Sequence, residues 1–240
     1  MPRHALTSAE ISLPQTARPA GVARRLALLA PHFDLVGLTD NHAGQARMSP
    51  LAAVALAREQ GVRTVVHVSC RDRNRLALQA QVVGAAALGC NGVCCVYGDP
   101  VPGVQRASDM KVAELIALVR PWSAPMDVTP GCVVNPFASD PAKERDLLRR
   151  KVEAGAEFLQ TQMVFDVPAL VRFLEQNADL LKGKRVFASV GITTDRRNGR
   201  PFHRAPWRAV AGGGAPAGTG WGRRRYGRGT RRGLGSRVGR

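Results

Sequence analysis

Residues 144–166, ERDLLRRKVEAGAEFLQTQMVFD, predict a helix, a tight turn and a buried strand in immediate succession. Apolar residues, among them Leu147 and Leu148, recur at helical spacing before Gly155. Glycine is the residue that most often follows the end of a helix, so the helix is expected to stop there. Residues 158–164 are short and apolar, which is typical of a parallel strand covered on both faces. The stretch therefore predicts one helix–strand unit of an α/β fold.

Two polar residues interrupt the predicted strand. Thr161 and Gln162 stand where a purely structural strand would carry Val or Ile. The amide of a glutamine near the carboxyl end of a parallel strand offers a ligand both a donor and an acceptor. Gln162 is therefore a candidate ligand-binding residue, and similar units elsewhere in the chain would complete its site.

The first 193 residues repeat this alternation of strand-like and helix-like segments. Strands are predicted at 9–14, 34–40, 63–70, 92–99, 131–135, 158–164 and 185–192. Helices are predicted at 20–30, 49–60, 74–88, 109–120, 142–156 and 167–181. Each strand but the last is followed by a helix, so right-handed βα units and a parallel sheet are expected.

A (β/α)8 barrel, the TIM-barrel architecture, is favoured over a Rossmann sheet. No G-x-G-x-x-G motif opens the first helix, and polar residues stand at the ends of almost every strand instead of at one crevice. In a barrel, the carboxyl ends of all strands meet at one mouth. The residues expected to converge there are Glu10, Thr39, Asp40, His67, Asp99, Asn135 and Gln162.

The alternating pattern stops after residue 193, so a barrel at 1–193 and a Gly/Arg-rich tail at 194–240 are predicted. The tail holds 13 Arg, one acidic residue and 12 of the 25 Gly, a net charge of +12. No eighth strand or closing helix is visible in it, so the barrel is expected to be truncated after strand seven. A disordered tail is expected. A reading-frame shift is the favoured origin, and the alternative is a genuine Arg/Gly tail that binds RNA non-specifically.

Outside the tail, the composition of residues 1–193 is that of an ordinary globular enzyme. Residues 1–193 carry 22 Lys+Arg and 17 Asp+Glu, a net charge of only +5. No apolar run is long enough to span a bilayer and no signal-peptide core is present, so a cytoplasmic protein without membrane contact is expected. The cysteines lack the paired spacing of zinc ligands, so buried thiols are expected and a metal is not. They are Cys70, Cys90, Cys94, Cys95 and Cys132.

Each strand-end residue has a chemical and a structural interpretation. Glu10 could be a buried acid that donates a proton, or a helix-cap or surface residue. His67 lies in an apolar strand, as core histidines do, but the polar run Arg71-Asp72-Arg73 follows it and favours a ligand role equally.

Each of the later candidates, taken alone, also has a chemical and a structural interpretation. Gly98 and Asp99 could bring backbone and an acceptor close to a ligand, or form a plain turn, and Asn135 before Pro136 has the same two interpretations. Arg150 and Lys151 belong to a basic patch that could meet a pyrophosphate or face solvent.

In combination, the segments resemble one family, methylenetetrahydrofolate reductase. The resemblance covers about residues 8–193, and its nearest variant is the reductase domain fused to homocysteine methyltransferase in some bacteria. The segments that carry it are EISLP (10–14), LTDNHAGQARMSP (38–50), HVSCRDRNR (67–75), LGCNGVCCVYGDP (88–100), CVVNP (132–136) and KVEAGAEFLQTQMVFD (151–166).

The resemblance implies a (β/α)8 barrel that holds FAD non-covalently at the strand carboxyl ends. NADH or NADPH would reduce the flavin and leave, and methylenetetrahydrofolate would then take the hydride to become 5-methyltetrahydrofolate in one-carbon metabolism. Glu10 would be the acid that assists opening of the folate ring, Asp99 would lie near flavin and pterin, and Gln162 would contact pterin and nicotinamide in turn. The other positions that match flavin contacts are Thr39, His67, Gly98, Ala107, Asn135, Arg150 and Lys151.

The chain also departs from the family pattern. Gly131 stands where some members have Tyr, and the tail replaces the segment that normally supplies further substrate contacts. Two other functions therefore stay open, an inactive barrel fragment and an RNA-binding protein that acts through the tail. The expected partners are a folate substrate and, in a homo-oligomer, further copies of the chain.

Overall fold

Seven parallel strands form one curved sheet in the order β1-β2-β3-β4-β5-β6-β7. This computed structural model describes residues 5–99, 101 and 107–191, and the structural statements that follow concern those residues. The strands are β1 Ser8–Ile11, β2 Leu35–Leu38, β3 Thr64–Ser69, β4 Gly92–Val96, β5 Thr129–Val134, β6 Phe158–Met163 and β7 Arg185–Ser189. All neighbouring strands pair in parallel, as the alternating sequence pattern predicts.

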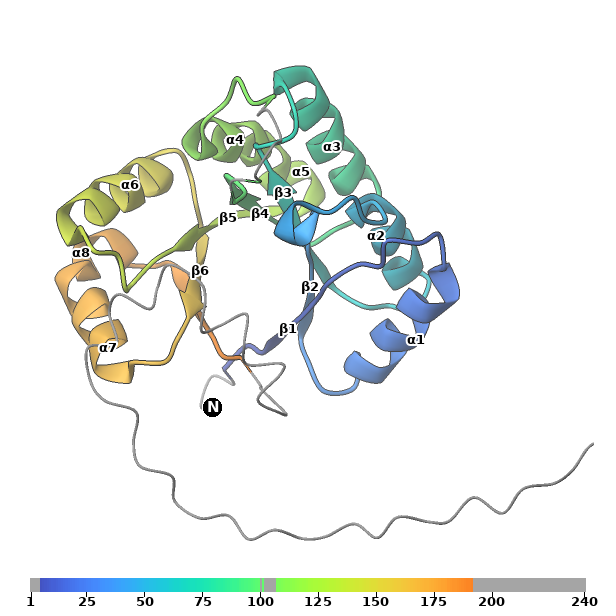
Figure 1. Cartoon of the computed structure of the whole chain (residues 1–240), viewed down its shortest axis with the longest axis horizontal. Helices are drawn as coiled ribbons and strands as arrows, with labels where there is room; N and C mark the ends of the chain where they lie inside the picture. The colour runs from blue at the N-terminus through green and yellow to red at the C-terminus, as the bar shows by residue number, and fades with distance from the viewer. Residues whose placement is uncertain (1–4, 100, 102–106, 192–240) are drawn as a thin grey trace, which may run out of the picture. The chain divides into compact units, whose positions relative to one another are not determined.

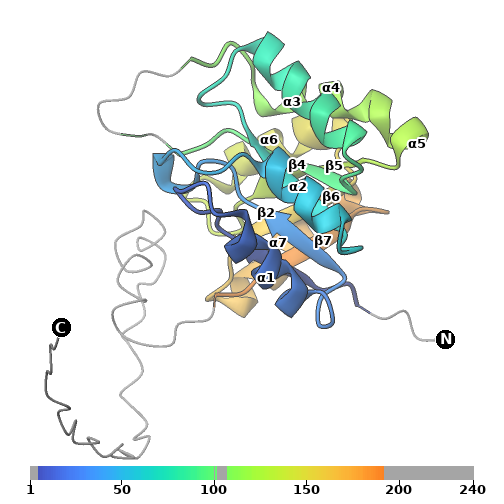
Figure 2. The ribbon, with the colours of Figure 1, turned by 90° about the vertical axis from the view of Figure 1, so that its right-hand side faces the viewer.

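Helices cover the outer face of the sheet, and the edge strands β1 and β7 curve toward each other (Figure 1). Figure 2 shows the same strands from the side, with helices packed along them. This arrangement confirms the expected TIM-barrel-like fold, with seven strands in the described part of the chain. The helices are α1 Pro19–Leu29, η1 His42–Gly44, α2 Pro50–Arg58, α3 Arg75–Ala87, α4 Val112–Val119, η2 Arg120–Trp122, α5 Ser123–Met126, α6 Pro141–Glu153, α7 Val167–Gln176 and α8 Ala178–Leu181.

The apolar core has two parts. The larger part lies between sheet and helices and fully buries one leucine from each of four helices, Leu26, Leu78, Leu115 and Leu148. A smaller cluster fills the interior of the barrel, because alternate strand residues point to opposite faces of the sheet. It consists of Leu35, Val65, Cys94 and Phe158.

The segment α6–β6 shows how local chemistry fixes one unit. Asp140 caps α6 by accepting a hydrogen bond from Lys143 N at 3.0 Å. Gly155, just past the helix, has a φ of 111°, a conformation that residues with a side chain rarely adopt. Leu148 is fully buried but its neighbour Leu147 is 39% exposed. Successive helical residues turn by about 100°, so only one of two adjacent leucines can face the core.

The observed elements differ from the predicted ones mainly at their ends. The fourth strand ends at Val96 instead of residue 99, because the chain leaves the sheet to form a loop at the mouth. The helix predicted at 167–181 is broken at Asn177, whose Nδ2 donates to Phe173 O at 2.7 Å. The end of the seventh predicted strand, residue 192, and the predicted tail lie outside the described residues.

The five cysteines are free and buried, as their spacing predicts. Burial raises the pKa of the Cys132 thiol to about 11, so this group stays protonated at neutral pH. None of the described helices is both long and apolar enough to cross a membrane.

Candidate functional site

Three polar side chains meet in the interior of the barrel, Glu10 of β1, His67 of β3 and Gln160 of β6. Gln160 Nε2 donates a hydrogen bond to Glu10 Oε2 at 3.0 Å. His67 Nε2 lies 3.6 Å from the same carboxylate oxygen. None of these three strands neighbours another in the sheet, so the contacts cross the barrel interior.

The strand between Glu10 and His67 leaves room for this contact. Gly37 of β2 pairs in register with Glu10 on one side and with Val65 on the other. A Cβ at Gly37 would stand 3.6 Å from the Cγ of Glu10. The absence of a side chain at Gly37 therefore leaves space next to the side chain of Glu10.

His67 is a buried base with an unused nitrogen. The residue is 8% exposed, and its Nε2 has no hydrogen-bond partner among the described residues. Burial lowers the pKa of His67 below its ordinary value, while the carboxylates of Glu10 and Asp40 and the amide of Gln160 oppose this change. The ring is therefore neutral at physiological pH.

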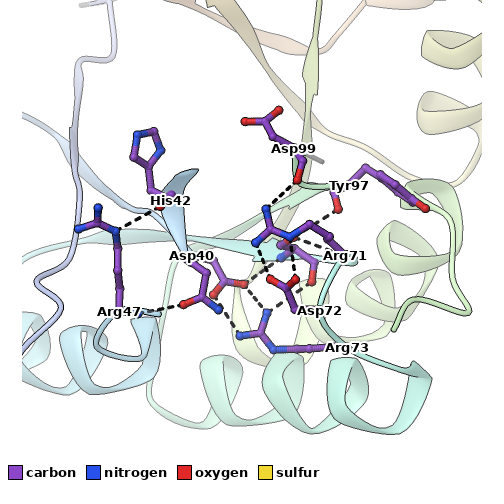
Figure 3. Close-up of polar contacts among 10 residues, drawn as sticks. Asp40, His42, Arg47, Arg71, Asp72, Arg73, Tyr97 and Asp99 are labelled. Carbon is purple, nitrogen blue, oxygen red and sulfur yellow. Dashed lines mark hydrogen bonds and ion pairs between the residues drawn. The ribbon is translucent and has the colours of Figure 1, made fainter. Parts of the chain in front are cut away.

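A second polar cluster lies at the carboxyl ends of β2, β3 and β4 (Figure 3). Asp40, 8% exposed, follows β2 and accepts a hydrogen bond from Ser69 N at 3.0 Å. Both terminal nitrogens of Arg73 donate to the same carboxylate, at 2.5 and 3.0 Å. A buried carboxylate needs such partners, so this pair fixes the ends of β2 and β3 to each other.

Arg71 connects β3 to the loop after β4 (Figure 3). Its Nη1 donates to Asp99 O at 2.8 Å, and its own carbonyl accepts from Ala107 N at 3.1 Å. The guanidinium also donates to both oxygens of Asp72, and this hydrogen bonding lowers the pKa of the Asp72 carboxyl. The side chain of Asp99 is left exposed at the mouth.

Gly98 in this loop is required by packing within the protein. Its φ is 89°, and a Cβ there would lie 2.4 Å from Ser69 Oγ and 2.9 Å from the Cβ of Arg71. A side chain at position 98 would therefore displace the end of β3.

The side chains of two predicted site residues form hydrogen bonds with backbone groups near the strand ends. Thr39 is 4% exposed, and its Oγ1 donates to Ile11 O at 3.4 Å. Asn135 Oδ1 accepts from Phe137 N at 3.0 Å, which closes the turn after β5. Thr39 is thus bonded across β1 and β2, whereas Asn135 shapes a loop.

The two basic candidates on α6 lie in different surroundings. Lys151 Nζ donates to Val133 O of β5 at 2.8 Å, so its ammonium group lies over the sheet. The side chain of Arg150 is 60% exposed and pairs with Asp146 one turn earlier on the same helix, at 2.7 Å. The structure therefore brings Lys151 against the barrel and leaves Arg150 on the helix surface.

Gln162 follows Gln160 by two residues toward the carboxyl end of β6, where the pairing with β7 is irregular between Gln160 and Met163. It is exposed, and its amide forms no hydrogen bond within the described part of the chain. Thr161 between them is 2% exposed and points the other way, its Oγ1 accepting from Ser189 N at 3.0 Å. The alternation of strand residues would have placed Gln160 beside Gln162, so the missed residue had a usable sequence signal.

The polar mouth is separate from the apolar end of the interior. A cavity of about 40 Å³ opens at the amino ends of the strands. Apolar side chains such as Leu35, Val65, Phe158 and Phe187 line it together with four polar ones, Arg63, Asn91, Thr129 and Arg185. The candidate site residues described above lie instead toward the carboxyl ends of the strands, where TIM-barrel sites are found.

Comparison with known proteins decides the family. Residues 3–194 match the family described as methylenetetrahydrofolate reductase. The chain belongs to this family. The match extends over the whole described barrel and includes every strand from β1 to β7.

Curated members of the family are distant and longer. The 5,10-methylenetetrahydrofolate reductase of Salmonella typhimurium is 27% identical over 154 residues, which are 63% of this chain and 51% of that protein. Methylenetetrahydrofolate reductase 2 of Saccharomyces cerevisiae is 22% identical over 148 residues, 56% of this chain and 25% of that protein. The match thus spans about half of the bacterial relative and a quarter of the yeast one.

Solved structures support the fold. A Clostridium thermocellum protein described as binding two copies of 5-methyl-5,6,7,8-tetrahydrofolic acid aligns with a TM-score of 0.54 at 13% identity, over 74% of this chain and 61% of that one. Mycobacterium tuberculosis tryptophan synthase aligns equally well, with a TM-score of 0.54 at 18% identity, over 78% and 75% of the two chains. At these identities the likeness concerns the fold alone.

Gly131, where the resemblance led us to expect Tyr in some members, packs closely against an aromatic ring. A Cβ at Gly131 would lie 2.3 Å from the ring of Phe158. That ring packs edge to face on Phe187, with centroids 6.0 Å apart. In this family member, Phe158 therefore fills the space that a larger residue at 131 would need.

Proposed function

We propose that the chain is a flavin-dependent reductase that converts 5,10-methylenetetrahydrofolate to 5-methyltetrahydrofolate with NADH or NADPH. The observation that carries the proposal is the carboxyl group of Glu10, whose side chain is 44% exposed within the polar interior of a barrel of this family. It is held by Gln160 on one oxygen and is open to a ligand on the other.

The polar residues at the mouth fit FAD. Buried His67 has an unpartnered Nε2 among the described residues, and a flavin at the mouth would give that nitrogen a partner. FAD supplies the hydride carrier between nicotinamide and folate. The residues proposed to hold it are Thr39, His67, Gly98, Asp99, Ala107, Asn135, Arg150 and Lys151.

Glu10 is proposed to act as the general acid. Opening of the folate's five-membered ring makes the carbon an acceptor for hydride, and it requires a proton on the departing ring nitrogen. A carboxyl group placed in a barrel mouth can give that proton and recover it from solvent afterwards. Asp99 and Gln162 are proposed to bind the pterin, and Gln162 also to bind the nicotinamide when it occupies the same place.

Absorbance spectroscopy of the purified full-length chain tests the proposal. We expect a flavin spectrum that is bleached by NADH or NADPH without oxygen and restored by methylenetetrahydrofolate, with 5-methyltetrahydrofolate as product. A protein that binds no added FAD, or whose reduced flavin is not reoxidised by the folate, would contradict it.

A second candidate function rests on the charge of residues 194–240. Their 13 Arg and single acidic residue favour non-specific binding of RNA. RNA retention that weakens steeply with salt, and disappears when residues 194–240 are deleted, would support this function.

A further inference from the structure

The two oxygens of the Glu10 carboxylate lie in different surroundings. Oε2 accepts the hydrogen bond from Gln160 Nε2 at 3.0 Å and faces His67 Nε2 at 3.6 Å. Oε1 accepts no hydrogen bond within the described part of the chain. The carboxyl group is therefore anchored on one side and free on the other.

We infer that Gln160 is a positioning residue for Glu10, which holds Oε2 as an acceptor and so places the transferable proton on Oε1. This inference rests on the proposed function and assigns a role to a residue that the family resemblance does not single out. Gln160 itself is not expected to touch the folate or the flavin.

The hydrogen bond from Gln160 decides which oxygen of the Glu10 carboxyl group carries the proton. A protonated carboxyl group has one O–H and one carbonyl oxygen. The N–H of Gln160 needs an acceptor, so Oε2 takes the carbonyl role and the proton resides on Oε1. When the Oε1–H bond breaks, its electron pair stays on the carboxylate and the proton forms an N–H bond at the departing ring nitrogen. The C–N bond of the ring breaks with its electrons going to that nitrogen, and the lone pair of the other ring nitrogen forms the C=N bond that accepts hydride. Gln160 holds Oε2 throughout, so the acid does not need to rotate during the reaction.

The groups around the carboxylate leave Gln160 as its donor. His67 is 3.6 Å away, beyond a normal hydrogen-bond distance, and burial keeps its ring neutral. The carboxylate of Asp40 is satisfied by Arg73 and Ser69. The other titratable groups that influence this part of the interior are His42 and Cys94, and burial keeps the Cys94 thiol protonated by raising its pKa.

Substitution Gln160→Leu removes the donor and keeps a side chain of similar size. Loss of a hydrogen bond to a charged or proton-transferring group costs substantial free energy. We therefore expect reoxidation of the reduced flavin by the folate to slow about tenfold or more. Reduction of the flavin by NADH or NADPH should keep its rate, and the folate concentration for half-maximal reoxidation should stay within about twofold. Gln176→Leu makes the same change on the exposed end of α7 and should alter neither half-reaction.

A double variant separates positioning from a general structural role. If Gln160 acts through Glu10, the pair Glu10→Gln with Gln160→Leu should reoxidise as slowly as Glu10→Gln alone. Multiplicative slowing in the double variant, or equal slowing of both half-reactions in Gln160→Leu, would overturn the inference.

A crystal structure of the Gln160→Leu protein gives a readout that is independent of activity. We expect the Glu10 carboxylate to occupy several orientations or to show clearly higher B-factors than its neighbours. A carboxylate that stays in place with unchanged order would overturn the inference. Failure of the wild-type protein to reduce the folate would instead contradict the proposed function, and the crystal structure would still decide whether Gln160 positions Glu10.

Discussion

The side chain of Gln162 is free in the mouth, which suits a residue that meets two ligands in turn. Its amide has both a donor and an acceptor and uses neither within the described residues. We therefore expect Gln162→Ala to slow flavin reduction by NAD(P)H and flavin reoxidation by the folate alike. Stopped-flow absorbance measures each step separately, and an effect on only one of them would contradict a shared binding place.

His67 gives the stability of the protein a pH dependence. Burial lowers the pKa of its ring in the folded state below the ordinary value of about 6.5, so the unfolded chain takes up the proton first. The stabilisation from a neutral His67 is complete above that ordinary value and is lost as pH falls toward the lowered folded pKa. The free energy of unfolding of wild type should therefore fall more steeply on acidification than that of His67→Gln.

Urea unfolding of both proteins at several pH values between neutrality and mild acid measures this difference. The difference between the two proteins removes the pH dependence of the titratable groups that both contain, and leaves that of His67. An identical pH slope in wild type and His67→Gln would show that the ring titrates alike in the folded and unfolded states.

At the scale of the element, two adjacent leucines of α6 differ sharply in burial. Leu148 is 0% exposed and lies in the main core, whereas Leu147 is 39% exposed. We expect Leu148→Ala to lower the free energy of unfolding by about 2–5 kcal/mol, because it leaves a cavity. The matched change Leu147→Ala should cost far less, and denaturant titration compares the two. Equal losses would mean that α6 packs in another orientation.

The elements themselves could be predicted from sequence, because their causes are local. Gly155 ends α6 through its backbone freedom, and Ser49 caps α2 by accepting a hydrogen bond from Leu51 N at 3.3 Å. The break at Asn177 was not predicted, because the apolar spacing continues through it and the hydrogen bond that marks it forms only in the folded chain.

At the scale of the whole molecule, the candidate site depends on contacts that no local pattern contains. Glu10 and Gln160 are 150 positions apart and meet only because the sheet curls around its interior. Sequence reasoning placed Glu10, His67 and Gln162 at one end of a barrel, since strand ends of a parallel sheet share an edge. It missed Gln160, although strand alternation with Gln162 marked that position, because only the curled sheet brings its amide to the carboxylate across the barrel.

The two proposed parts of the chain lead to a prediction about the tail. The buried core that the structure describes is built from residues between 5 and 191. We expect a chain that ends at residue 193 to have the same free energy of unfolding as the full chain, to within about 0.5 kcal/mol by urea titration. It should also lose any RNA retention. A large loss of stability would show that residues 194–240 form part of the fold.

The central claim, that Glu10 is the acid of a folate reductase, is tested most directly by stopped-flow flavin absorbance of Glu10→Gln in each half-reaction. Hydride transfer from NAD(P)H to flavin needs no acid of this kind, whereas ring opening of the folate does. We expect unchanged flavin reduction and a reoxidation by methylenetetrahydrofolate that is about 10²–10⁴-fold slower than in wild type. Equal slowing of both half-reactions, or slowing of neither, would contradict the claim.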